Sequence, residues 1–138
     1  GSEMCIRDRL YTKAYSRLSG LKLSGEDKQL YNKLSVLASV SGKYDAYKSF
    51  SDSGYVTMAA DSLVCAAGRC AVNADNAKEY GCELQLEQLK TIISDTLSSQ
   101  YGLSYDDAIA LYNIDDRDDY TLALTQKLNE LGIKEETK

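Results

Sequence analysis

At 138 residues the chain has the size of one domain, and such a domain buries about two thirds of its unfolded surface without help from metals or disulfides. Hydrophobic residues make up 43% and charged residues 27%, and no apolar run approaches the ~18 residues of a membrane span, so none is expected. Lys and Arg outnumber Asp and Glu nine to six in residues 1–53, but are outnumbered three to six in 54–100 and four to nine in 101–138. This acidic C-terminal third argues against nucleic acid as a partner, because affinity for phosphates needs clustered cations.

The first residues are set apart from the predicted fold. Gly1-Ser2 is typical of a tag-cleavage remnant, and residues 4–9, MCIRDR, resemble a translated sequencing-adapter peptide of the kind that enters metagenome assemblies. We therefore expect a leader over residues 1–9, a single helical domain over 10–132 and a frayed tail over 133–138.

Apolar residues at helical spacing predict two or three helices in the first third of the chain. The first carries its apolar residues every four positions and should stop at Gly20; these are Ile6, Leu10, Ala14 and Leu18. The second begins at Ser24 as a capping residue, with an inner face of Leu30, Leu34, Leu37 and Ala38. Gly42 either breaks this helix or lies within it. Tyr44, Tyr47 and Phe50 then form an aromatic edge on a short helix that ends at Gly54.

The stretch from residue 55 to residue 80 is rich in small side chains and has no proline. Its small residues are Ala59, Ala60, Ala66, Ala67, Gly68, Ala71, Ala74 and Ala77. They fall on several faces of a helix, which lets neighbouring helices approach closely on more than one side. We predict one helix here, at the centre of the domain.

Three further helices complete the predicted fold. The first carries Leu86, Leu89, Ile93 and Leu97 and should end at Gly102. A capping box of Ser104 and Asp107 opens the second, which carries Ala108, Ile109 and Tyr112. Asp115 or Asp116 caps the third, with Tyr120, Leu124, Leu128 and Leu131 on its inner face.

A glycine followed at once by an apolar residue ends each of five predicted elements. These pairs begin at Gly20, Gly54, Gly81, Gly102 and Gly132. A Schellman turn has this pattern, because glycine adopts the left-handed conformation and the next side chain folds back on the last helical turn. The sequence therefore predicts an all-α bundle of about six to seven helices, built as helical hairpins around the alanine-rich helix.

From Gly54 the chain reads G-x-V-x-x-A-x-x-x-L-x-x-A, through Val56, Ala59, Leu63 and Ala66. This spacing resembles one half of a tetratricopeptide repeat, in which paired helices nest through alternating small and large residues. The pattern does not recur 34 residues earlier or later. The resemblance implies that helical hairpins of this chain stack as such repeats do and leave a groove for a partner.

The cysteines do not form a metal-binding pattern. Cys65 and Cys70 lie five residues apart on one predicted helix and point ~140° apart, the chain has no histidine, and Cys82 is the only other thiol beyond the leader. We expect buried, reduced thiols, with no metal and no cofactor, and these favour a reducing, cytoplasmic compartment.

Aspartates form the densest charge cluster, at positions 106, 107, 115, 116, 118 and 119. Read from Asn113 or Asp115, the chain lacks the glycine and the bidentate glutamate of a calcium-binding EF-hand loop. Some of these carboxylates should cap helix N-termini. The others predict an acidic ridge that faces a basic partner; its candidate residues are Asp115, Asp116, Asp118 and Asp119.

The chain has eleven tyrosines, one phenylalanine and no tryptophan. Tyrosine suits helix edges and interfaces, because its ring packs while its hydroxyl needs a polar partner. Tyr44, Tyr47 and Tyr55 could stack on a base or a peptide, with Tyr112 as a further candidate. The alternative is that these rings cover the core with their hydroxyls in water.

No motif in the sequence specifies a reaction. A nucleophile would have no histidine as its base, and the glycines stand singly instead of forming a phosphate-binding loop. We therefore predict a non-catalytic helical interaction module that holds a protein partner, with homo-oligomerisation left open. One alternative is a small acidic inhibitor of a host defence protein, of the kind phages encode, docking through residues 104–131. The other is a helical protein that binds a nucleotide or another small molecule.

Overall fold

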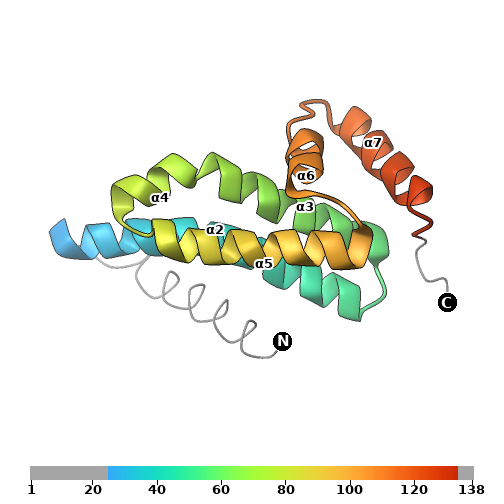
Figure 1. Cartoon of the computed structure of the whole chain (residues 1–138). Helices are drawn as coiled ribbons and strands as arrows, with labels where there is room; N and C mark the ends of the chain where they lie inside the picture. Colours follow the sequence, from blue (N-terminus) through green and yellow to red (C-terminus); the bar gives the residue numbers. More distant parts are fainter. Residues whose placement is uncertain (1–24, 134–138) are drawn as a thin grey trace.

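The computed structural model describes residues 25–133, and these are all-helical, without strands (Figure 1). The helices are α2 (Gly25–Asp52), α3 (Val56–Val72), α4 (Ala74–Tyr80), α5 (Glu83–Tyr101), α6 (Tyr105–Tyr112) and α7 (Arg117–Glu130). The predicted all-α bundle is thereby confirmed. The predicted helix ending at Gly20, the cap at Ser24, Cys5 and residues 134–138 lie outside the described residues.

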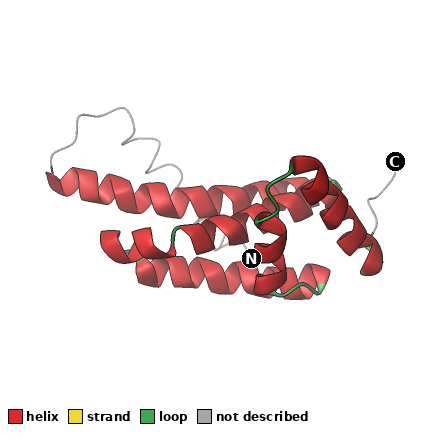
Figure 2. Ribbon diagram, turned by 90° about the horizontal axis from the view of Figure 1, so that it is seen from above, coloured by secondary structure: helices red, strands yellow, loops and turns green. Residues whose placement is uncertain are grey.

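Three long helices, α2, α3 and α5, run lengthwise beside one another and form the body of the bundle (Figures 1 and 2). The shorter α6 and α7 follow as a hairpin placed over one part of this body. Among the described helices, α3 contacts each of the others. It is therefore the central helix that its composition predicts.

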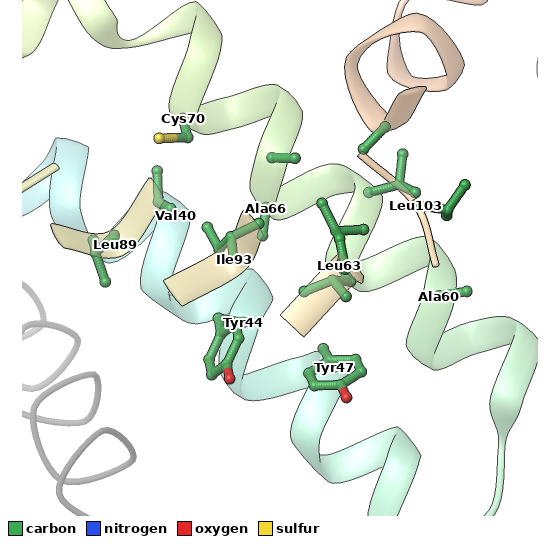
Figure 3. Packing of buried hydrophobic residues seen from close by; sticks show 14 of the residues in the cluster. Val40, Tyr44, Tyr47, Ala60, Leu63, Ala66, Cys70, Leu89, Ile93 and Leu103 are labelled. Atoms are coloured by element: carbon green, nitrogen blue, oxygen red, sulfur yellow. The ribbon is translucent and has the colours of Figure 1, made fainter. Parts of the chain in front are cut away.

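Small residues bring α3 close to its neighbours. Ala59, Ala66 and Ala67 have no exposed surface, and Leu63 is equally buried. Figure 3 shows Leu63 and Ala66 of α3 packed in one cluster with Val40 and the tyrosines of α2 and with Leu89 and Ile93 of α5. At Gly68 the Tyr112 ring of α6 lies so near the backbone of α3 that an added Cβ atom would be 2.1 Å from it. Only glycine leaves room for that ring.

The stretch predicted as one helix is two helices, and this corrects the prediction. α3 ends at Val72, and α4 begins at Ala74 after a bend at Asn73. The Asn73 amide Nδ2 donates to the carbonyl of Arg69 at 2.8 Å, and the Asn73 backbone N–H donates to that same oxygen at 3.0 Å. A side chain that competes for backbone acceptors in this way favours a helix end.

Helix α2 passes through Gly42 without a break, so the aromatic residues 44–50 belong to it and not to a separate helix. Its buried face also differs from the predicted one: Leu30 is 47% exposed, while Leu37 is buried. Because the helix is continuous, the stripe that faces the core extends into its second half. The buried residues of α2 are Val36, Leu37, Val40, Ser41, Tyr44 and Tyr47.

The predicted glycine turns are present at every described position. Gly54, Gly81, Gly102 and Gly132 have positive φ, between 65° and 82°. After three of them the next residue donates its N–H to the carbonyl five positions earlier, as a Schellman turn requires: Tyr55 to Phe50, Cys82 to Ala77 and Ile133 to Leu128. Cys82 and Leu103 fold back into the core and are at most 1% exposed.

Candidate functional site

The acidic cluster lies on the α6–α7 hairpin, where two capping arrangements set its geometry. At α6 the Ser104 hydroxyl accepts from the Asp107 N–H at 3.0 Å, and the Asp107 carboxylate accepts from the Ser104 N–H at 3.2 Å. These hydrogen bonds lower the pKa of Asp107. At α7 the Asp116 carboxylate accepts from the Asp119 N–H at 2.9 Å. The predicted capping box is confirmed, and of the two predicted cap residues, Asp115 and Asp116, it is Asp116 that caps α7.

The remaining carboxylates of this cluster face solvent. Asp115, Asp116, Asp118 and Asp119 are all exposed, within the linker between α6 and α7 and the first turn of α7. The first turn of a helix favours negative charge, so the fold holds these groups together despite their mutual repulsion. The result is a compact exposed patch with an excess of negative charge, four carboxylates against the exposed guanidinium of Arg117, which we call the acidic patch.

A depression of about 210 Å³ lies between α6 and α7. Its lining residues are Asp107, Ala110, Leu111, Ile114 and Lys127. The three middle members give it an apolar floor, Asp107 and Lys127 bring opposite charges to it, and Ile114 is followed directly by the acidic patch. We call this depression the hairpin groove; sequence reasoning did not find it.

Polar contacts join the hairpin to the bundle. The Tyr120 hydroxyl of α7 donates to the carboxylate of Asp61 on α3, and burial together with this bond raises the pKa of Tyr120. The Tyr105 hydroxyl of α6 donates to the Ala67 carbonyl at 3.2 Å, and the Lys90 ammonium lies 5.0 Å from the centre of the Tyr105 ring. The only sequence signal for these contacts is the surplus of tyrosine, whose hydroxyls need partners when buried.

The tyrosines predicted as one stacking surface are not brought together on the surface, and this corrects the prediction. Tyr44 and Tyr47 are each only 7% exposed, with ring centres 5.6 Å apart, and Tyr47 also meets Tyr101 at 6.4 Å. The Tyr44 hydroxyl is satisfied within the protein by Thr96 Oγ1 at 3.1 Å. Figure 3 shows both rings inside the packed cluster.

The other two candidate tyrosines have separate settings. Tyr55 is 52% exposed and makes an edge contact with Phe50, with ring centres 6.5 Å apart. Tyr112 is half-buried and covers Gly68. Of the predicted tyrosines, therefore, only Tyr55 presents a largely exposed ring.

The described cysteines are free thiols, and Cys70 and Cys82 are buried as predicted, while Cys65 is half-buried. Burial is the main cause that raises the pKa of all three, so they are protonated at neutral pH and weakly nucleophilic. Across residues 25–133, no three His, Cys, Asp or Glu side chains gather in a way that could hold a metal ion.

Comparison of the chain with family models, with curated proteins and with solved structures found no match. None of the helices in the described part is long and apolar enough to cross a membrane.

Proposed function

We propose that this protein is a non-catalytic helical interaction module that binds a basic protein partner through its α6–α7 hairpin. The observation that carries the proposal is the acidic patch: Asp115, Asp116, Asp118 and Asp119 are all exposed on one short segment. Clustered charge of one sign speeds association with an oppositely charged surface and selects against partners of like charge.

The chemistry of the described thiols supports a binding role over a catalytic one. Nucleophilic catalysis by cysteine needs a thiolate, and the raised pKa values of Cys65, Cys70 and Cys82 oppose its formation. Thiols of this kind also fit the reducing, cytoplasmic compartment that we propose for the protein.

We also propose that α2 and α3 nest in the manner of a tetratricopeptide hairpin. In support, the small and large residues of the matching pattern are buried: Ala59, Leu63 and Ala66 have no exposed surface. Such nesting would make the bundle a rigid support for the hairpin.

An inhibitor of a basic nucleic-acid-binding protein, such as a host defence protein, is a second candidate that uses the same acidic patch. It differs from the first only in the partner, whose own nucleic-acid site would be blocked. The small-molecule alternative loses its main motivation, because Tyr44 and Tyr47 lie in the core and cannot close over a ligand.

The proposal is tested by affinity capture from cells that encode the protein, with variants matched in charge. Neutralising the acidic patch with D115N, D116N, D118N and D119N preserves the cap, because asparagine is also a good N-cap residue. The control variant neutralises four exposed carboxylates elsewhere, with D75N, E79Q, E83Q and E87Q.

We expect one partner to be captured by the wild type and by the control variant, and to be lost from the patch variant. Equal capture by all three proteins, or recovery of background proteins alone, would contradict the proposal. An added nucleic-acid competition assay separates the two candidates, because only an inhibitor would displace nucleic acid from the captured partner.

A further inference from the structure

The hairpin groove combines an apolar floor with the acidic patch that directly follows Ile114, and this combination defines a partner more closely than charge alone. We infer that the segment bound there is a basic amphipathic helix, whose apolar residues sit on Leu111 and Ile114 while its Lys and Arg side chains meet the acidic patch and Asp107. This inference rests on the proposed function and names the partner's chemistry.

The floor has the properties of a docking surface. Leu111 packs partly against the core, whereas Ile114, which also lines the groove, does not belong to the core cluster or to the residues packed against it. Both remain half-buried and therefore keep apolar surface in contact with water. Covering that surface is favourable at ~25 cal/mol for each Å² removed from water.

The length of the groove fits a helix. Its lining residues run from Asp107 to Ile114 along α6 and the linker, seven positions apart, which corresponds to about 10 Å at ~1.5 Å per helical residue. Two turns of a partner helix cover that length and present apolar residues at i, i+3 or i+4, and i+7. At about 210 Å³ the depression has room for such anchoring side chains and not for a whole domain.

A peptide that binds as a β-strand would lack a comparable site. Peptides that bind as strands add to the open edge of a sheet, and residues 25–133 contain no strand. A nucleic acid is disfavoured by charge, since residues 104–133 carry seven Asp or Glu against Arg117 and Lys127 alone. A helix with a basic face satisfies both the groove and the charge.

The inference is tested with a synthetic peptide of about 18 residues made of leucine and lysine, long enough to form a helix when bound. Its leucines are spaced to form one apolar face, and a scrambled peptide of the same composition has no such face. Binding is followed by fluorescence anisotropy of the labelled peptide, and helix formation by circular dichroism.

Two variants separate the floor from the charge. I114S removes apolar floor without touching the core, and L122S is its control, because Leu122 is 58% exposed on α7 and does not line the groove. The patch variant with four asparagines and its charge-matched control, both described above, test the electrostatic part. Circular dichroism of each variant shows whether it is folded.

We expect the amphipathic peptide to bind and become helical, with I114S and the patch variant each weakening binding at least about tenfold, or ~1.4 kcal/mol, and with both controls within about twofold of the wild type. Equal binding of the scrambled peptide, no effect of I114S, or no binding at all would overturn the inference. If the peptide experiment fails but the affinity-capture experiment still recovers a partner with the wild type and not with the patch variant, the inference about a helix is wrong and the proposed function stands. If the capture experiment fails, the proposed function itself is contradicted.

Discussion

The bundle of α2, α3, α4 and α5 differs from the α6–α7 hairpin in how each is held together. The bundle supplies most of the buried core, including the alanines of α3 and the leucines of α5. The hairpin contributes only Ala108, Leu124 and Leu128 as buried apolar side chains, and its other attachments include the hydroxyls of Tyr105 and Tyr120. Small apolar residues thus produce a closely packed bundle, while the clustered aspartates lie on the α6–α7 hairpin, where they are exposed to partners.

The largest expected effect comes from removing a core side chain in each region. Leu63 has no exposed surface and lies in the middle of α3, so L63A should lower the free energy of unfolding by about 2–5 kcal/mol. L124A should lower the free energy of unfolding by less, because fewer groups pack around α7 and because α7 can unfold locally while the bundle stays folded. Urea denaturation measures the first effect and hydrogen exchange the second. Equal costs, with global unfolding in both variants, would break the comparison.

The junction between the two regions is tested at Gly68. G68A places a methyl group against the Tyr112 ring, and overpacking of this kind costs about 1–3 kcal/mol. Gly42 is the control, because it also lies within a helix but nothing lies within 4 Å of the added Cβ. G42A should therefore stabilise the protein by about 0.5–1 kcal/mol through helix propensity. Stabilisation by both substitutions would show that Tyr112 is free to move off α3.

The hydrogen bond between Tyr120 and Asp61 should contribute about 1–2 kcal/mol, because it is partly buried and its acceptor is a carboxylate. Y120F removes the hydroxyl and keeps the ring. We expect faster hydrogen exchange in α7 with little change in α2 and α5. Y55F is the matched control: because Tyr55 is 52% exposed, this substitution should leave hydrogen exchange unchanged. A uniform rise across all helices would indicate that α7 is part of the same cooperative unit as the bundle.

Alkaline pH should lower the stability of both regions, whereas pH changes around neutrality should leave it unchanged. Burial raises the pKa of Tyr101 to about 12 and raises those of Tyr47 and Tyr120 as well. A group whose pKa is raised on folding contributes full stability below its unfolded value, ~10 for tyrosine, and loses it as the pH rises toward the folded value. The free energy of unfolding should therefore begin to fall above about pH 8.5, where the thiols of the unfolded chain ionise while the folded thiols, whose pKa is raised, stay protonated, and more steeply above pH 10. Y101F should reduce the slope above pH 10, and an unchanged slope would contradict the burial of Tyr101.

Local features of the fold were predictable from sequence, because they depend on neighbouring residues. The glycine turns and the cap at Asp116 are of this kind: all four described glycines have positive φ, three of their turns have the Schellman hydrogen bond, and Asp116 accepts from the Asp119 N–H. The bend at Asn73 is also local, but asparagine occurs in many uninterrupted helices, so its side-chain bond to Arg69 gave no clear signal.

The site was predictable only in part. Clustered aspartates at helix starts indicated that the carboxylates would be exposed, but the hairpin groove depends on how α6 packs against α7. The contact between Tyr120 and Asp61 joins residues 59 positions apart. Likewise, the burial of Tyr44 and Tyr47 depends on where α5 lies, which places Thr96 and Tyr101 beside them. Such long-range contacts leave no periodic pattern in a single sequence.

The central claim is that the bundle supports a hairpin that binds, and an NMR titration of the isotope-labelled protein with the leucine–lysine peptide tests it most directly. We predict amide shift changes confined to α6, residues 113–116 and α7, with α2 and α5 unmoved. Shift changes centred on α2 or α5, with the hairpin unaffected, would contradict the claim.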